Sequence, residues 1–424
     1  MEFERQESIS VEDFAENYLK LNKPVLIGLS ATSEWRARKE WVVATKDKAT
    51  GHINETPNYD ALLELFGDHT VTVAHCNQKY FSDQERTDMK FKNFINKIKN
   101  KQEGSMTTQL YCKDWHFVLE KPEYVAYTTP AQFSSDWLNI YCQSKPNPDD
   151  FRFFYMGDDR TWTPFHQDVY SSYSWSANIC GEKHWTFILP GQNHLFTDSF
   201  GNTIYNIHDY DKLRYPDFEK AKKIELIQRP GECIFVPSNW WHQVENRGVT
   251  ISINHNWCNA YNVTNIIGRL HFDYSNVVHA LRDIQDMDGF LEQCQIVLKA
   301  ENGMSHSECI SFLLYIASVY LDLANDDESE GEDQSENGSD DDDYAIDPSS
   351  GFRPDASFSI AYADPYFTSQ PSIIYALSRI KKAFEMLVDG TGISNIKYKP
   401  VFIPNLLETI ESTTKEIDSV LSRN

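Results

Sequence analysis

The hydrophobic pattern separates a strand-rich middle of the chain from a helix-rich end. Between about residues 108 and 258, short runs of aromatic and β-branched residues alternate with Gly, Pro, Asn and Asp. The clearest runs are 152–156, 184–189, 233–236 and 250–256. Many short strands with frequent turns are typical of an antiparallel barrel or sandwich.

The first hundred residues mix helix and strand signals. Ser10, followed three residues later by Asp13, predicts a capped helix with Phe14 and Leu19 on its apolar face. Residues 23–27 then predict a short strand. We therefore expect an N-terminal α/β region over residues 1–104.

After residue 257 the apolar positions recur every three to four residues, as a helix requires. The segment 373–387 shows this spacing clearly, and 278–323 and 404–421 show it similarly. Residues 326–347 contain twelve acidic residues and no Lys or Arg, so they cannot bury a core and are expected to form a disordered, solvated loop. The pattern predicts an α+β protein with a β-rich core over 105–265 and a helical region over 266–424.

The composition limits the classes of partner. The net charge is −24, and the acidic segment accounts for half of it, so the remainder is acidic too. Such a surface repels phosphate backbones, which argues against nucleic acid and is compatible with a basic protein partner. Without a secretory signal or a run of about 18 apolar residues, we expect a soluble intracellular protein that does not span a membrane.

The eight cysteines are scattered and include no CxxC pair. This spacing disfavours a zinc ribbon or a disulfide framework. Several of them lie in apolar, strand-like runs, so we interpret them as reduced, small core residues.

A candidate metal site begins in the segment 163–168, TPFHQD. On an extended strand, residues two apart point to the same side, so His166 and Asp168 can converge on one metal ion. His271 and Asp273 have the same spacing but lie in a helical pattern, where residues two apart diverge by about 200°. We expect the first pair to chelate and the second pair not to.

A second block, PGECIFVPSNWWHQVEN (230–246), supplies a third ligand. A Pro-Gly turn enters an apolar strand, a proline ends it, and His242 heads the next β run, which can bring it to the mouth of a barrel. Two histidines and one carboxylate on one face of a metal leave three positions open, as in the facial triad of non-heme Fe(II) oxygenases.

An iron site with open positions needs a co-substrate, and Lys183 suggests which one. This lysine begins a strand in a mostly apolar setting, 17 residues after His166. A buried ammonium requires an anionic partner, and the distal carboxylate of 2-oxoglutarate would serve, with Thr163 or Tyr111 adding a hydroxyl. A surface position at the strand end is the alternative. Residues 250–257 alternate polar and apolar side chains, as expected for a barrel interior that holds a dianion and iron.

Five blocks together resemble the JmjC-type Fe(II)/2-oxoglutarate oxygenases, and within them the lysyl hydroxylase subfamily. They are LYCKDWH (110–116), FSSDWLN (133–139), WTPFHQDVYSSYSWSANICGEKHW (162–185), PGECIFVPSNWWHQVEN (230–246) and TISINHNWCN (250–259). The resemblance implies a cupin-like double-stranded β-helix, or jelly roll, over 105–265, with the N-terminal region packed on it. It also implies Fe(II) as cofactor, with 2-oxoglutarate and O2 as co-substrates.

The resemblance assigns roles to individual residues. His166, Asp168 and His242 match the iron ligands of the family. The residues that match or approach its cofactor-binding positions are Lys183, which pairs with the distal carboxylate, Tyr111 and Thr163, which assist it, and Asn254 and Asn178, which line the pocket.

The resemblance further implies hydroxylation of a lysine side-chain carbon, on a basic segment of a translation release factor, in the cytoplasm or the nucleus. The C-terminal helices either dimerise, as in some relatives, or cap the barrel. Two alternatives stay open: an N-methyl-lysine demethylase, which uses the same iron site, and a non-catalytic cupin scaffold. A metal hydrolase is disfavoured because the chain has no HExxH motif.

Overall fold

The computed structural model describes residues 3–46, 53–100, 109–146, 149–329, 364–390 and 405–423. It divides into two compact units. Unit 1 comprises Met1–Pro130, Asp150–Asp168 and Tyr173–Asn256, and unit 2 comprises Ala131–Asp149, Val169–Ser172 and Trp257–Asn424.

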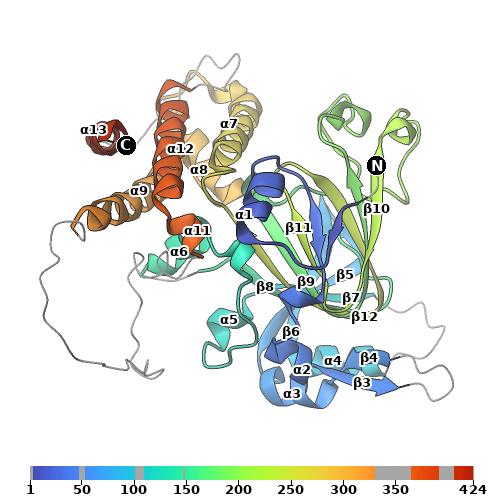
Figure 1. Ribbon diagram of the computed structural model, residues 1–424. Helices are drawn as coiled ribbons and strands as arrows, with labels where there is room; N and C mark the ends of the chain where they lie inside the picture. The colour runs from blue at the N-terminus through green and yellow to red at the C-terminus, as the bar shows by residue number, and fades with distance from the viewer. Residues whose placement is uncertain are drawn as a thin grey trace, which may run out of the picture. The chain divides into compact units, whose positions relative to one another are not determined.

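Unit 1 is built on a ten-stranded sheet with the order β1-β2-β11-β9-β12-β8-β7-β5-β6, and β10 pairs with β9 (Figure 1). The strand β1 runs parallel to β2, whereas β11 and β10 run antiparallel to β9, and β8 antiparallel to β12. The strands are β1 (Arg5–Gln6), β2 (Val25–Ile27), β5 (Thr70–Tyr80), β6 (Asp83–Lys90), β7 (Leu110–Trp115), β8 (Arg152–Gly157), β9 (Tyr173–Ile188), β10 (Lys223–Gln228), β11 (Cys233–Val236) and β12 (Trp241–Trp257). All four strand runs expected from the hydrophobic pattern are confirmed.

Two long strands turn a corner and give the sheet its two layers. The first half of β9 pairs with β11 and its second half with β10, and Gly181 lies between the halves with φ of +71°. In β12, Gly248 has φ of +69° and separates residues 242–246 from the half that pairs with β8. Glycine adopts this left-handed conformation without a steric penalty, and such bends let a strand pass from one layer to the next. The result is the predicted jelly roll.

The rest of unit 1 consists of a small hairpin and short helices. Figure 1 shows α2, α3 and α4 gathered with this hairpin at one end of the large sheet. Ser10 caps α1 by accepting a hydrogen bond from the Asp13 amide, as predicted. The elements are β3 (Val42–Lys46), β4 (Ile53–Pro57), α1 (Val11–Phe14), α2 (Arg36–Glu40), α3 (Tyr59–Phe66), α4 (Phe91–Lys99), α5 (Phe117–Glu120), a π-helical turn at Ala15–Leu19, and 3₁₀ turns at Leu29–Ala31, Asn193–Leu195 and Phe218–Lys220.

Apolar side chains fill the inside of the jelly roll. Trp185 and Phe187 of β9 pack with Ile234 and Val236 of β11 and with Trp240 in one buried cluster. All eight cysteines are free and buried, which confirms that they are small core residues.

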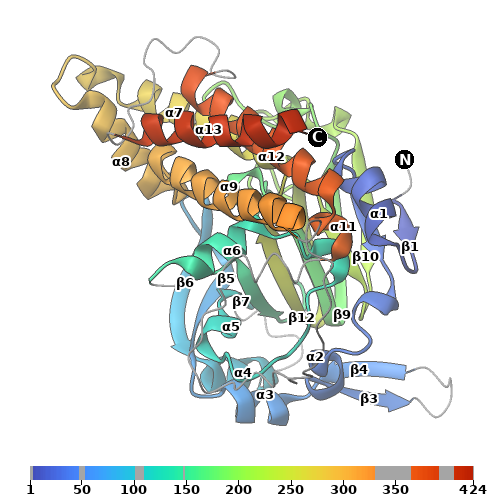
Figure 2. The same ribbon diagram turned by 60° about the vertical axis from the view of Figure 1, so that its left-hand side comes forward.

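Unit 2 is helical, as predicted for the end of the chain. Its long helix α12 packs against α7, α9 and α13 (Figure 2). The helices are α6 (Trp137–Ser144), α7 (Val263–Ala280), α8 (Phe290–Asn302), α9 (His306–Ser329), α11 (Pro365–Thr368), α12 (Gln370–Asp389) and α13 (Leu406–Arg423), with 3₁₀ turns at Ala131–Phe133, Val169–Ser171 and Arg282–Ile284.

The end of α9 overlaps the predicted acidic loop. The helix continues to Ser329, so the first residues of the predicted loop are helical rather than disordered, and residues 330–347 lie outside the described residues. The stretch His306–Asn325 is long and apolar enough to cross a membrane, but 56% of it is buried inside the protein, as in a core helix. The domain boundaries at 104 and 265 stay predictions.

Candidate active site

The backbone brings the two predicted histidine ligands opposite each other. The segment that contains His166 runs antiparallel beside the start of β12, and Thr163 donates to the Val244 carbonyl at 3.0 Å. His166 and His242 exchange two backbone hydrogen bonds of 3.0 and 2.9 Å. Residues paired in this way project their side chains to the same face, and the imidazole centroids are 4.4 Å apart.

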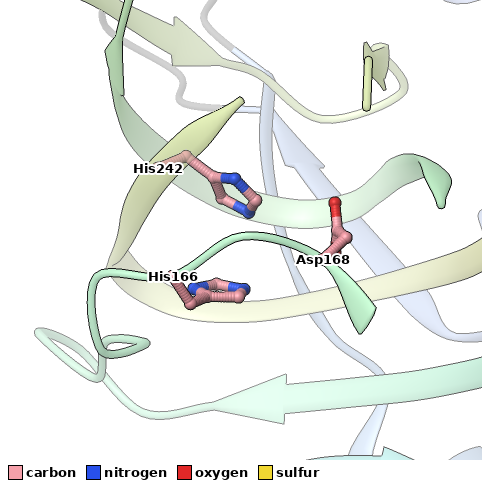
Figure 3. Close-up of side chains that lie close together, drawn as sticks. All are labelled: His166, Asp168 and His242. Atoms are coloured by element: carbon pink, nitrogen blue, oxygen red, sulfur yellow. The ribbon is translucent and has the colours of Figure 1, made fainter. Parts of the chain in front are cut away.

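Asp168 completes the cluster. One potential ligand atom from each of His166, Asp168 and His242 lies within 4.8 Å of the others. Figure 3 shows the three side chains turned toward one another. His242 is 3% exposed, whereas the other two are half-buried, so the cluster is accessible from one side. This is a two-histidine, one-carboxylate set of the composition that binds Fe(II).

Main-chain carbonyls orient both imidazoles. His166 Nδ1 lies 2.7 Å from the Pro164 carbonyl oxygen, and His242 Nδ1 lies 3.0 Å from that of Trp240. A carbonyl only accepts hydrogen bonds, so Nδ1 carries the proton and Nε2 offers its lone pair to a metal. Burial and the neighbouring His166 lower the pKa of His242 to about 4, which keeps this imidazole neutral at physiological pH.

A serine supports the carboxylate. Ser174 Oγ donates to Asp168 Oδ2 at 2.8 Å, which leaves Oδ1 available to a metal. The prediction from the sequence did not include Ser174. Its alternation with Ser176 and Asn178 on β9 was the available signal, because a period of two places these polar side chains on one face.

The second His-x-Asp pair has a different environment. His271 and Asp273 lie on α7, as expected, and Asp273 forms an ion pair with Arg269 at 2.8 Å. Its carboxylate is therefore engaged within its own helix. The structure does not group this pair with a third ligand among the described residues.

Lys183 lies inside the jelly roll, which excludes the surface alternative. It is 2% exposed, and its Nζ donates to the Tyr111 hydroxyl oxygen at 3.1 Å. Burial lowers the pKa of Lys183 to about 7. Within the described ranges, no carboxylate approaches Nζ to ion-pair distance. The pair thus presents the Lys183 amino group and the Tyr111 hydroxyl group, and both can donate a hydrogen bond to an anion.

The strand that carries Lys183 also reaches the histidine cluster. Trp185 projects from the same face of β9, and its ring centroid is 5.6 Å from that of His242. The Phe187 ring is also 5.6 Å from the His242 ring. The buried ammonium and the metal-binding cluster are therefore adjacent parts of one interior.

The polar face predicted for β12 joins the same interior. Thr250 and Tyr111 are the two partners of Gly157 across β8, which places both on one face, and Ser252 follows on that face. The hydroxyls of Thr250 and Ser252 are buried without a hydrogen-bond partner. Buried polar groups without partners are rare. These hydroxyls, together with the Lys183 amino group that has no carboxylate partner among the described residues, therefore fit a polar, anionic ligand such as 2-oxoglutarate.

The other predicted cofactor residues take part in protein contacts. Thr163 Oγ1 accepts a hydrogen bond from the Val244 amide at 3.2 Å, and Asn254 Oδ1 accepts one from Ser176 at 3.0 Å. Asn178 Nδ2 donates to the Gly181 carbonyl at 2.7 Å and braces the corner of β9, while its Oδ1 has no partner. The cofactor-binding roles of these three residues stay predictions.

Comparison with known proteins gives the family. Residues 11–262 match the cupin-like domain family. The chain is 40% identical over 328 residues to 2-oxoglutarate and iron-dependent oxygenase JMJD4 of Danio rerio, covering 76% of this chain and 75% of that protein. The identity to the Homo sapiens JMJD4 is 33% over 322 residues, covering 74% and 75%. The chain belongs to the cupin-like JmjC oxygenase family.

Other JmjC relatives carry different names. The chain is 42% identical over 322 residues to arginine-specific demethylase JMJ20 of Arabidopsis thaliana, covering 72% of this chain and 67% of that protein. Membership of the JmjC family therefore leaves the choice between hydroxylation and demethylation open.

Proposed function

We propose that this chain is an Fe(II)- and 2-oxoglutarate-dependent dioxygenase that hydroxylates a lysine side-chain carbon of a protein. One observation carries the proposal: His166, Asp168 and His242 converge beside a buried lysine that has no carboxylate partner among the described residues. A scaffold without turnover would have no use for a buried ammonium, which is unfavourable to maintain without an anion.

The interior of the jelly roll would hold Fe(II) and the distal carboxylate of 2-oxoglutarate in two adjacent places. His166, Asp168 and His242 would bind Fe(II) through two imidazoles and one carboxylate oxygen. Lys183 and Tyr111 would bind the distal carboxylate of 2-oxoglutarate, the first as an ammonium and the second as a hydroxyl donor. When bound, iron and 2-oxoglutarate supply an oxidant made from O2 as the oxo acid loses CO2 and becomes succinate.

The residues of the chain then have three tasks. The carbonyls of Pro164 and Trp240 and the hydroxyl of Ser174 fix the directions of the ligands. The Lys183 ammonium and the Tyr111 hydroxyl orient the co-substrate. Apolar side chains such as Trp185 and Phe187 exclude water beside His242, so that the oxidant meets the target C–H bond. No side chain needs to act as a general base.

The proposed target is a lysine in a basic segment of a translation release factor, and we propose that the reaction takes place in the cytoplasm, with the nucleus as the second location. The resemblance to the lysyl hydroxylase subfamily and the net charge of −24 support this choice. We propose no nucleic-acid or membrane partner, and association of two chains through the C-terminal helices is a secondary proposal.

Demethylation is the second candidate, and the name of the Arabidopsis relative JMJ20 favours it. Hydroxylation of an N-methyl carbon gives a hemiaminal, which breaks down to formaldehyde and the demethylated amine. Hydroxylation of a carbon without nitrogen gives a stable alcohol. The same ligand set serves both reactions, so the bound side chain determines the product.

The test is mass spectrometry after incubation of the full chain with Fe(II), 2-oxoglutarate, O2 and a purified eukaryotic release factor. We expect one added oxygen atom on a lysine, with succinate formed in equal amount. Methylated histone and ribosomal peptides serve as the second substrate set, and loss of a methyl group from arginine or lysine would support demethylation instead. The control variant is His194→Ala, which removes an exposed histidine and should keep activity. The His166→Ala variant should be inactive whether the reaction is hydroxylation or demethylation.

A further inference from the structure

A large cleft in unit 1 opens beside the segment that carries the first histidine ligand. Its volume is about 1060 Å³. Trp162 and Phe165, which precede His166 in this segment, form part of its lining. The other walls come from the end of β5 and from the loop 201–215, and Phe165 donates its amide to the Tyr205 carbonyl at 2.9 Å. The cleft is thus continuous with the polypeptide that positions the proposed iron ligands.

Three unusually exposed apolar side chains belong to the segments that line this cleft. Leu213, Phe200 and Phe81 are 94%, 87% and 82% exposed, the three highest values for large apolar residues in the described part of the chain. Phe81 lines the cleft, and the other two are immediate neighbours of the lining residues Gly201 and Arg214. Scattered exposed apolar residues are ordinary, whereas a cluster around one cleft marks an interaction site.

Phe81 also occupies a backbone position that does not suit it. It lies at the tip of the β5–β6 hairpin with φ of +51°, where Asn or Gly is favoured. Its ring contacts that of Tyr80 at a centroid distance of 4.7 Å, and Tyr80 is itself 64% exposed. An exposed aromatic residue in a left-handed turn weakens the fold, so its presence indicates a role in binding.

Charge defines the kind of partner. The only arginine of the lining, Arg214, is already paired with Asp198, and Lys79 lies over the Tyr205 ring at 4.4 Å. Asp209 and Asp211 also line the cleft and form no ion pair with any residue of the described ranges. Lys79 likewise has no carboxylate partner among the described residues, so these two aspartates and this lysine leave one net negative charge, which suits a basic segment.

We propose that this cleft binds an extended, basic segment of the protein substrate and takes up an apolar side chain that flanks the target lysine. The inference rests on the proposed function for the identity of the target residue. Phe81 of the lining contacts the apolar side chain, and Phe200 and Leu213 add apolar surface next to the lining. Asp209 and Asp211 attract the neighbouring basic residues.

The test uses a peptide-display library with a fixed central lysine and randomised flanking positions. The library is selected on the full chain with Fe(II) and 2-oxoglutarate without O2, so that binding is measured without turnover. We expect selected peptides to share an apolar residue near the lysine and an excess of Lys and Arg. A selection without an apolar preference, or no selection at all, would overturn the proposal.

Two variants separate binding from stability. The single variant Phe81→Asn suits the turn, so we expect it to keep or raise the melting temperature. The double variant Phe81→Asn with Leu213→Ser should weaken binding of a selected peptide about tenfold. Leu21→Ser is the matched control, because Leu21 is 63% exposed and is not one of the lining residues. Unchanged affinity in the double variant would contradict the cleft assignment.

Selected peptides are finally incubated with the enzyme in air. Peptides that bind through the cleft but gain no oxygen would contradict the proposed hydroxylation and still support the cleft. Peptides that are hydroxylated equally well by the double variant would support the hydroxylation and overturn the cleft.

Discussion

Two segments of this chain share a His-x-Asp sequence and differ in what surrounds them. His166 and Asp168 lie on an extended segment whose partner strand supplies His242. His271 and Asp273 lie on α7, where the aspartate pairs with Arg269 one turn away. The residue types and the spacing are identical, so the backbone period decides which pair can chelate. A metal motif is informative only together with the secondary structure that carries it.

The first prediction separates the two motifs by function. We expect His166→Ala to bring Fe(II) binding and 2-oxoglutarate turnover below detection, because one of three ligands is lost. His271→Ala should instead lower the free energy of unfolding by about 2 kcal/mol or more, because a buried side chain is truncated, while folded molecules retain turnover. Succinate formation and thermal unfolding measure the two effects. Undiminished succinate from His166→Ala would remove the iron assignment.

The second prediction extends the comparison to lysines. Lys183 is buried without a carboxylate partner in the described ranges, whereas Lys381 of the helical unit forms an ion pair with Asp418. We expect Lys183→Met to weaken 2-oxoglutarate binding about 30-fold or more, the usual cost of removing a buried charged donor. Lys381→Met should leave that affinity unchanged. Titration calorimetry decides, and a normal 2-oxoglutarate affinity in Lys183→Met would show that another residue holds the dianion.

The third prediction concerns the serines near each motif. Ser174 donates to Asp168, and Ser275 donates to the His271 backbone carbonyl at 2.8 Å. We expect Ser174→Ala to weaken Fe(II) binding about 10- to 100-fold, as for other residues that orient a ligand. Ser275→Ala should leave it unaltered. Fe(II) titration of both variants is the measurement, and equal affinities would mean that Asp168 needs no support.

The fourth prediction is a pH dependence of co-substrate binding. The pKa of Lys183 is about 7 in the free protein, and a bound dianion favours the charged form. Below pH 7 the ammonium is already present, whereas above pH 7 binding must take up a proton, so affinity falls by at most about tenfold per pH unit. Calorimetry in buffers of different ionisation enthalpy reports the proton uptake. If the 2-oxoglutarate affinity of the unaltered protein did not change with pH, as expected for Lys183→Met, the proposed protonation of Lys183 would be contradicted.

The sequence predicted the strands and helices, and the three side chains that the structure brings together, because their signals are local. The alternating pattern of 250–257, the Pro-Gly turn before β11 and the extended setting of His166 and Asp168 each lie within a few residues. Binary patterns and turn residues report directly on the backbone period, which explains why the helical His271 motif could be set aside.

What the sequence missed, as for Ser174, or left open, as for the burial of Lys183, depends on pairing between distant segments. Ser174 reaches Asp168 only because β9 turns back beside the ligand segment, and the burial of Lys183 depends on β7, which supplies Tyr111. The local sequence around a lysine at a strand end is the same whether the side chain faces solvent or the interior of the protein. Strand register across many residues is set by the whole fold rather than by any local pattern.

The corner of β9 at Gly181 lies between two residues of the candidate site. Ser174 precedes this corner and Lys183 follows it on the same strand. A Cβ atom at position 181 would approach the Thr250 side chain and the Val249 carbonyl to 2.6 Å, in a backbone conformation that side chains already resist. A residue without any functional group therefore positions both Ser174, next to the proposed metal ligand Asp168, and Lys183, the proposed partner of the oxo acid. Changes at this corner should move both affinities in concert, so that neither can be tuned there without the other.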